Sequence, residues 1–192
     1  MRTHLIRTAF LLALALSALT MPATAQTPPA SVVVANPTYV TIPMEVTVNK
    51  SAADVWARIG KYCAIKDWFP LPCTILSGNE DEIGAVRSVA AEVMVGKTAL
   101  SYTYTQTPRE GRPYNMYHGT LEARPLTATT SKLIYTLFFD TSMLPDQAAR
   151  DKDRAGKIAT FTKGLENMKL LAEGGTLPPP PPKPAAPAPA AR

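Results

Sequence analysis

Apolar and polar side chains alternate along much of the stretch from residue 98 to residue 140. Leu100, Tyr102 and Tyr104 fall on one side of this alternation, with serine and threonine at the positions between them. A period of two is typical of a β-strand with one buried face. Short turns rich in Gly, Pro, Asn and Thr separate these segments and favour an antiparallel meander. The expected strands cover residues 45–48, 73–78, 84–95, 98–106, 114–124 and 131–140.

A short helix is expected directly after the first strand. Ser51 is a good N-cap, because its hydroxyl can accept a hydrogen bond from a backbone N–H of the first turn. Asp54 complements the positive end of the helix dipole. Val55, Trp56 and Ile59 then follow with the spacing of an apolar helix face.

A long helix is expected from Asp146 to about Glu173. A proline precedes this segment and two glycines follow it, as is typical of helix ends. Its apolar stripe has a 3-4-3 spacing and consists of Ile158, Phe161, Leu165 and Met168. The strands and this helix together predict an α+β domain in which an antiparallel sheet carries one long C-terminal helix.

The same helix carries a stripe of small residues. Gly156, Thr160 and Gly164 are spaced i, i+4 and i+8, so they share one face. An interior glycine costs about 1 kcal/mol relative to alanine, which indicates that this face must leave room. The room serves either a close-packed strand or a ligand.

Both ends differ in composition from the part between them. Residues 1–25 have a basic start, an apolar run and a small-x-small pattern that ends at Ala25, which predicts a signal peptide cut after Ala25. Residues 26–39 are expected to be flexible, and residues 176–192 form a Pro/Ala-rich tail that is expected to be disordered. We expect a periplasmic or secreted protein without stable membrane insertion after signal cleavage. A retained membrane anchor, and a protein partner for the tail, are the alternatives.

The excess of basic over acidic residues in the whole chain comes mostly from its two ends. The chain has 20 Lys and Arg against 15 Asp and Glu, but four of the basic residues lie in the signal segment and the tail. The remaining 16 basic and 15 acidic residues nearly cancel. No nucleic-acid partner is expected, because such recognition needs a concentrated basic face.

The chain has two cysteines, Cys63 and Cys73, ten residues apart. In an exported protein such a pair predicts a disulfide, and two buried thiols are the alternative. No histidine lies near them and their spacing is not that of a metal site, so no metal site is expected.

The order of these features resembles the SRPBCC superfamily of START-related, polyketide cyclase and birch-pollen-allergen-like proteins. The resemblance rests on a strand, a capped helix with Val55-Trp56, Trp68 near a proline and the strand Gly84-Ala85-Val86-Arg87. It implies a helix-grip domain over residues 40–175: a curved antiparallel sheet wrapped around a long C-terminal helix, with two short helices after the first strand. Such a fold encloses a cavity.

The resemblance also implies which side chains face that cavity. The expected inward residues of the sheet are Arg87, Val89, Ala91, Tyr102, Tyr104, Tyr117, Tyr135, Leu137 and Phe139, and the helix adds Gly156, Thr160 and Gly164. Tyrosine suits a wall that is mostly apolar and still orients a ligand. The alternative is that these tyrosines are ordinary core residues.

The sequence leaves the roles of three ionisable residues undecided or predicts no part in ligand binding for them. Arg87 either holds an anionic head group of a ligand or forms a buried ion pair, with Glu92 as the nearest candidate. Glu92 lies close to a tight turn and is expected to be solvated. His118 is expected to point away from the cavity, and no catalytic set can be built around one histidine.

We therefore expect an exported protein that binds a small, largely apolar molecule, such as a lipid, an isoprenoid or an aromatic metabolite. No cofactor is expected and no catalytic residue is assigned. An enzyme of the cyclase or dehydratase type is the first alternative. A protein-interaction module whose cavity is filled by side chains is the second.

Overall fold

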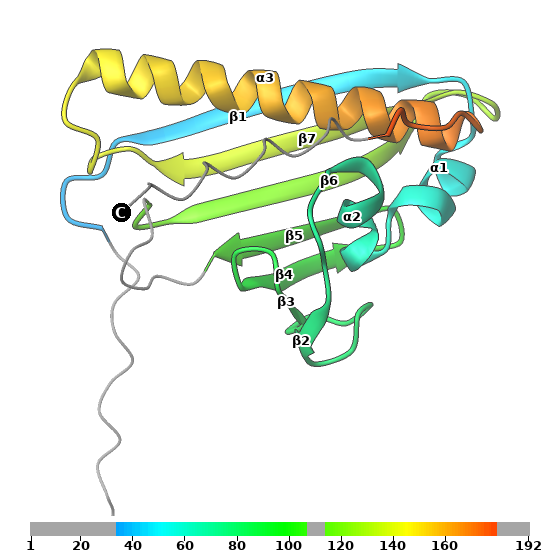
Figure 1. The fold of residues 1–192 in the computed structure, drawn as a ribbon, viewed down its shortest axis with the longest axis horizontal. Coiled ribbons are helices and arrows are strands. Elements are labelled where there is room, and N and C mark those ends of the chain that lie inside the picture. The colour runs from blue at the N-terminus through cyan, green and yellow to red at the C-terminus, as the bar shows by residue number, and fades with distance from the viewer. Residues whose placement is uncertain (1–33, 107–113, 180–192) are drawn as a thin grey trace, which may run out of the picture. The chain divides into compact units, whose positions relative to one another are not determined.

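The computed structural model describes residues 34–106 and 114–179 (Figure 1). Seven antiparallel strands form one sheet in the order β1-β7-β6-β5-β4-β3-β2. The strands are β1 (Tyr39–Val48), β2 (Ile75–Ser77), β3 (Val86–Arg87), β4 (Glu92–Thr98), β5 (Ser101–Gln106), β6 (Tyr117–Pro125) and β7 (Ser131–Asp140). The helical elements are α1 (Ala52–Ile59), the 3-10 turn η1 (Tyr62–Ala64), α2 (Ile65–Trp68) and α3 (Gln147–Ala172). The helix-grip architecture expected from the sequence is confirmed.

The buried face of the sheet follows from the alternation in the sequence. In β7 every second side chain from Leu133 to Phe139 is fully buried, and the residues between them are half-buried. Figure 1 shows α3 lying along β1 and β7, with α1 and α2 near its C-terminal end. The core therefore lies between one face of the sheet and these helices.

The cap of α1 is confirmed. The Ser51 hydroxyl accepts a hydrogen bond from the Asp54 backbone N–H at 3.1 Å. Val55 and Ile59 are fully buried, and Trp56 is partly buried against the core. The helix is therefore held at its start by a local hydrogen bond and along its length by burial of one face.

Helix α3 packs tightly only along its second half. Asp146 is its N-cap and accepts a hydrogen bond from the Ala149 N–H at 2.8 Å. Leu165 and Met168 are buried, but Ile158 is 37 % exposed, so its placement in the apolar stripe is wrong. Large apolar residues are scarce between residues 147 and 160, and that half of the helix has no buried side chain. The first half of α3 therefore does not pack closely on the sheet.

Two strands differ from the sequence-based expectation. The expected strand over residues 84–95 is a hairpin, in which a four-residue turn separates β3 from β4. Ala90 and Ala91 of that turn have φ angles of 54° and 51°, a region that alanine rarely adopts. Because the turn contains neither glycine nor asparagine, the sequence did not indicate a turn at this place. Strand β1 extends to Tyr39 despite Pro43, because it lies at the edge of the sheet, where proline is tolerated.

The Cys63–Cys73 disulfide is confirmed. It joins η1 to the segment before β2 and closes a loop that contains α2 and the residues after it. Both half-cystines are 7 % exposed. The bond therefore anchors the segment from α2 to β2 on the edge of the domain.

Removing this disulfide should lower the free energy of unfolding by about 2–3 kcal/mol, because the unfolded chain gains the entropy of a loop of this length. The change is the double variant C63A/C73A, and urea unfolding followed by circular dichroism measures the effect. Wild-type protein kept in a thiol reductant should show a loss of similar size. Equal stability of oxidised and reduced wild-type protein would contradict the prediction.

Among the helices that the structure describes, none combines the length and apolar character needed to cross a membrane. The expected signal peptide and residues 180–192 of the tail lie outside the described residues.

Candidate functional site

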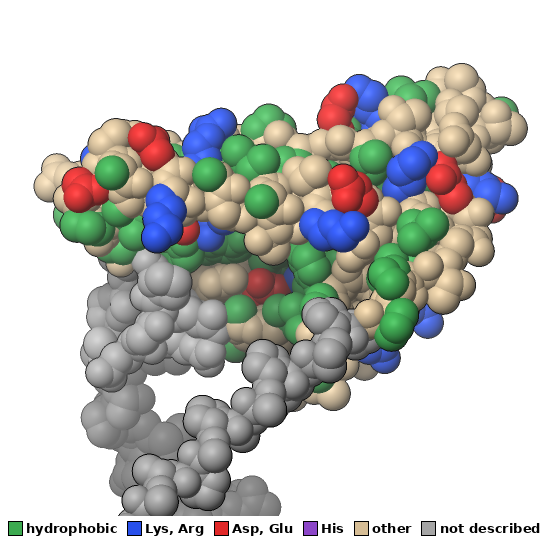
Figure 2. All heavy atoms as spheres, turned by 45° about the horizontal axis from the view of Figure 1, so that its top comes forward, with side chains coloured by type: hydrophobic (Ala, Val, Ile, Leu, Met, Phe, Trp, Pro, Cys, Tyr) green, Lys and Arg blue, Asp and Glu red, His purple; other side chains and the backbone are tan. Residues whose placement is uncertain are grey.

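A hollow of about 300 Å³ lies between α3, the sheet and the segment that follows α2. Figure 2 shows the molecule hollowed beneath the long helix, with hydrophobic side chains along the wall. Its lining comes from three places. The segment from α2 contributes Ile65, Phe69, Pro70 and Leu71, the hairpin turn and sheet contribute Val89, Ala90, Glu92, Tyr104, Gln106, Tyr117 and Tyr135, and α3 contributes Thr160 and Phe161.

Tyrosine side chains form the sheet wall of this hollow. The hydroxyls of Tyr104 and Tyr135 lie 3.0 Å apart and share a hydrogen bond. Burial raises the pKa of both well above the ordinary value of 10.0, and it also raises the pKa of Tyr117. At neutral pH these phenols are therefore protonated, so they can orient a ligand oxygen but do not act as bases.

The position of Tyr104 depends on a glycine in the neighbouring strand. Gly119 is the cross-strand partner of Tyr104 in β6. A Cβ atom at residue 119 would lie 2.4 Å from the Tyr104 ring, so the ring needs the absence of a side chain there. This pairing of a large ring with glycine across two strands holds Tyr104 flat against β6.

Phe69 and Phe161 close the hollow from the helix side. The Phe161 ring lies 4.7 Å from Tyr135 and 5.9 Å from Phe69, measured between ring centroids. Phe69 packs over Gly164, where a Cβ atom would approach the ring to 2.9 Å. Gly164 therefore provides room for an aromatic side chain of the protein.

Arg87 and Glu92 form a buried ion pair behind this wall. They are cross-strand partners in β3 and β4, so the hairpin places them opposite each other. The Arg87 Nε donates to Glu92 Oε2 at 2.7 Å, and Nη2 lies 2.6 Å from the same oxygen. Arg87 Nη1 donates to the Tyr62 carbonyl oxygen at 2.7 Å, and its guanidinium lies over the Tyr62 and Tyr104 rings.

This pair decides between the two roles open for Arg87. The side chain is fully buried and engaged with Glu92, and it does not line the hollow. Glu92 is 4 % exposed, so the expectation that it is solvated is wrong. The carboxylate can be buried because the Arg87 guanidinium compensates its charge. The Gln106 carboxamide donates a hydrogen bond to its other oxygen at 3.1 Å.

The structure places the residues expected from the sequence in different surroundings. Val89, Tyr104, Tyr117, Tyr135 and Thr160 line the hollow. Arg87, Tyr102, Leu137 and Phe139 are buried but do not line it, Ala91 lies in the hairpin turn, and Gly164 lies under Phe69. Gly156 faces open space in a neighbouring hollow.

Several lining residues were missed by the sequence-based reasoning. Phe69, Pro70 and Leu71 follow α2 without any periodicity that would mark them as part of a wall. Their proximity to Phe161 depends on the disulfide-bonded segment folding back on α3. Gln106 was missed because it is the last residue of β5, where the alternation ends.

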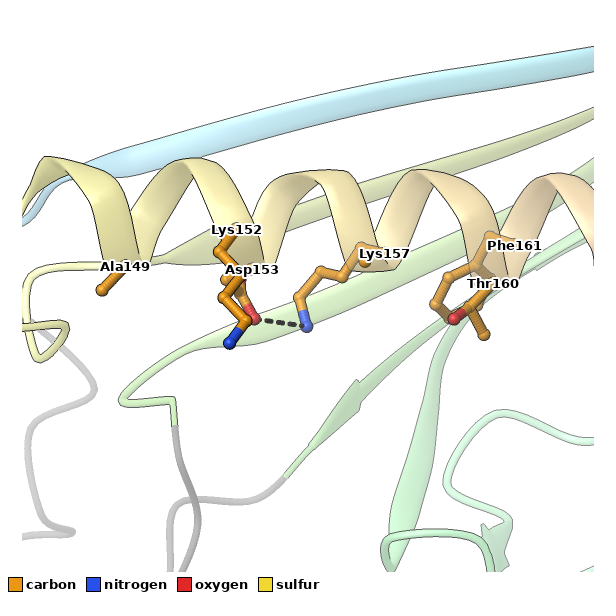
Figure 3. Close-up of a pocket in the computed structure, with 7 residues that line it drawn as sticks. Ala149, Lys152, Asp153, Lys157, Thr160 and Phe161 are labelled. Carbon is orange, nitrogen blue, oxygen red and sulfur yellow. Dashed lines mark ion pairs between the residues drawn. The ribbon is translucent and has the colours of Figure 1, made fainter.

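A second hollow of about 550 Å³ lies along the first half of α3. Figure 3 shows its lining side chains, which point from one face of the helix in the same direction. They are Ala149, Lys152, Asp153, Gly156, Lys157, Thr160 and Phe161. Thr160 and Phe161 line both hollows, so the two are neighbours along α3.

Within residues 34–106 and 114–179, no group of three or more His, Cys, Asp or Glu residues is arranged to hold a metal ion. His118 is half-buried in β6, one position away from the wall residue Tyr117 and hence on the opposite face of the strand.

Solved structures share this architecture. A protein from Thermobifida fusca is 24 % identical over 71 % of this chain and 97 % of its own, with a TM-score of 0.58. The Zhui aromatase/cyclase from Streptomyces sp. R1128 is 15 % identical over 72 % and 100 %, with a TM-score of 0.52. A START superfamily protein from Mycobacterium smegmatis is 16 % identical over 69 % and 97 %, with a TM-score of 0.51. No family model and no curated protein sequence matches the chain.

These likenesses show the fold. The chain has the helix-grip fold that START superfamily proteins and aromatase/cyclases of this kind share. The resemblance inferred from the order of strands, helices and tryptophans agrees with them. In this chain the fold leaves a hollow between the sheet and α3.

Proposed function

We propose that this protein binds a small, largely apolar molecule in the hollow between α3 and the sheet. The observation that carries the proposal is the hollow itself, because aromatic and aliphatic side chains line most of it. Pockets for small molecules are typically concave and apolar, with a few polar groups that fix orientation. An open hollow also favours binding over an interaction module whose cavity is filled by side chains.

The polar groups of the wall define the ligand further. The hydroxyls of Tyr104 and Tyr135 and the Gln106 carboxamide lie among apolar residues. Tyrosine hydroxyls and a carboxamide can each donate and accept hydrogen bonds. The ligand class is therefore a lipid, an isoprenoid or an aromatic metabolite that carries one or two oxygen atoms.

We place this function outside the cytoplasm. The disulfide supports this, because such bonds persist mainly in oxidising compartments. The signal-like composition of residues 1–25 supports it as well. The mature protein then meets its ligand in the periplasm or outside the cell.

Blocking the hollow should abolish binding. Thr160 is exposed and lines both hollows, so the variant T160F places a ring in the space without disturbing the core. With N-phenylnaphthylamine as an apolar probe, we expect at least a tenfold loss of affinity, which corresponds to about 1.4 kcal/mol. Calorimetric titration of the mature protein measures it.

The matched control is A159F, one position along the same helix. Ala159 is exposed and lines neither hollow, so this variant should bind the probe as the wild-type protein does. Circular dichroism establishes that both variants fold. A wild-type protein that does not bind the probe, or an equal loss in both variants, would contradict the proposed function.

A further inference from the structure

Lys157 lies at the centre of the second hollow and is held by two other residues. Its Nζ donates to the Tyr114 hydroxyl at 2.7 Å and lies 3.4 Å from an Asp153 carboxylate oxygen. The Tyr114 hydroxyl donates to that same carboxylate oxygen. The Lys157 side chain is 15 % exposed. Its contacts with Tyr114 and Asp153 hold the ammonium at the rim of the sheet.

An aromatic platform lies beneath this ammonium. The Nζ of Lys157 lies 4.3 Å from the centroid of the Tyr114 ring, 5.0 Å from Phe139 and 5.4 Å from Tyr117. Ring faces attract cations, so the platform holds the charge in place. Burial nevertheless lowers the pKa of Lys157, and the nearby Asp153 only partly opposes this effect. Asp153 therefore offsets only part of the desolvation cost of the ammonium.

The surroundings leave a net positive charge facing open space. Among the residues that the structure describes, Lys152 and Lys157 line this hollow together with one carboxylate, that of Asp153. Figure 3 shows Lys152, Asp153 and Lys157 pointing to the same side of α3. A Cβ atom at Gly156 would meet no atom within 4 Å, so the hollow is open at this residue.

This charged region adjoins the apolar hollow. Thr160 and Phe161 line both, and they lie eight residues beyond Lys152 and Asp153. At 1.5 Å per residue the helix spans about 12 Å over this distance. Lys157 lies four residues before Phe161, which is about 6 Å along the helix axis. A molecule of about 6–12 Å can therefore place an anionic group near Lys157 or Lys152 and its apolar body beside Phe161.

We propose that Lys157, supported by Lys152, binds the acidic end of an anionic amphiphile whose apolar body occupies the hollow between α3 and the sheet. The inference rests on the proposed function and names its ligand class: a carboxylate or sulfonate attached to a lipid-like or aromatic body. It moves the head-group site from Arg87, whose charge is used by Glu92, to Lys157. A charge-assisted hydrogen bond from the ammonium to the anion supplies the selectivity.

The test uses two probes that differ in one group. Anilinonaphthalene sulfonate and N-phenylnaphthylamine have the same apolar body, and only the first carries an anion. In K157Q the affinity for the sulfonate should fall at least tenfold, which corresponds to about 1.4 kcal/mol, because the charge-assisted hydrogen bond to the anion is lost. The affinity for the neutral probe should change less than twofold.

Two further variants keep the test independent of folding. D153N removes the carboxylate that competes for Lys157, so it should raise the affinity for the sulfonate, which a misfolded protein would not do. K163Q changes an exposed lysine of the same helix that pairs with Glu166 and should leave both affinities unchanged. Calorimetric titration of the mature protein measures all of these affinities.

The outcomes separate this inference from the proposed function. If the wild-type protein binds neither probe, both are overturned. If it binds both probes and K157Q weakens them equally, or if D153N does not raise the sulfonate affinity, the protein is a binder of apolar molecules and the head-group site at Lys157 is refuted.

Discussion

Above about pH 10 the protein is expected to lose its stability steeply and unfold. Six tyrosines have a raised pKa, chiefly because burial disfavours the phenolate: Tyr62, Tyr102, Tyr104, Tyr114, Tyr117 and Tyr135. A phenol that stays protonated in the folded protein above pH 10 ionises in the unfolded chain. Alkali therefore favours the unfolded state.

The sign and size follow from proton linkage. Above the ordinary value of 10.0 the folded protein binds more protons than the unfolded chain, so stability falls as the pH rises. Each such group contributes about 1.4 kcal/mol per pH unit, so the three most deeply buried tyrosines contribute about 4 and all six about 8. The opposing effect of Lys157, whose pKa is lowered, comes from one group. A typical domain stability of about 5–15 kcal/mol is thus lost within one to three pH units.

Urea unfolding at a series of pH values measures this slope, with tyrosinate absorbance recorded in parallel. Ionisation of the tyrosines should coincide with loss of the circular dichroism signal. The double variant Y104F/Y135F removes two of the buried phenols, so its slope should be shallower by about 3 kcal/mol per pH unit. Ionisation of these six tyrosines near pH 10 while the protein stays folded would contradict the account of this wall.

Breaking the Arg87–Glu92 pair should destabilise the protein by about 3–5 kcal/mol, the usual cost of leaving one charge buried without its partner. In E92Q the guanidinium of Arg87 stays charged, because arginine does not lose its proton in proteins. The side chain is fully buried and cannot reach water. The free energy of unfolding from urea titration is the measurement.

A double variant tests whether the loss comes from the unpaired charge. Removing both partners in R87M/E92L should cost less than E92Q alone, since apolar residues of similar size replace the pair. The matched control is the exposed Arg124–Glu122 pair, whose removal should cost at most about 1 kcal/mol. If E92Q is as stable as the wild-type protein, the buried pair does not contribute as described.

Local signals in the sequence predicted most of the fold. The Ser51 cap, the alternation in β7 and the extent of α3 depend on neighbouring residues, and each was predicted. The hairpin between β3 and β4 was missed, because its turn holds alanines in a conformation that glycine usually marks. The exposure of Ile158 was missed because spacing alone does not show where a helix leaves the sheet.

The candidate site was predicted less completely. The alternation of β5 to β7 and the family resemblance placed Tyr104, Tyr117 and Tyr135 on one wall, where they lie. The arrangement of Lys157, Asp153 and Tyr114 was not foreseen. Tyr114 and Lys157 are 43 residues apart, and only the course of α3 past the segment before β6 brings them together. Such contacts leave no pattern in a single sequence.

The central claim is that a small apolar molecule binds in the hollow between α3 and the sheet. Amide NMR spectra of the mature protein, recorded during titration with N-phenylnaphthylamine, test it most directly. The signals of Phe69, Val89, Tyr104 and Phe161 should shift together and saturate at one equivalent, because these residues surround the hollow. Shifts confined to exposed apolar side chains such as Leu76, Ile83 and Leu126, or no shifts at all, would contradict the claim.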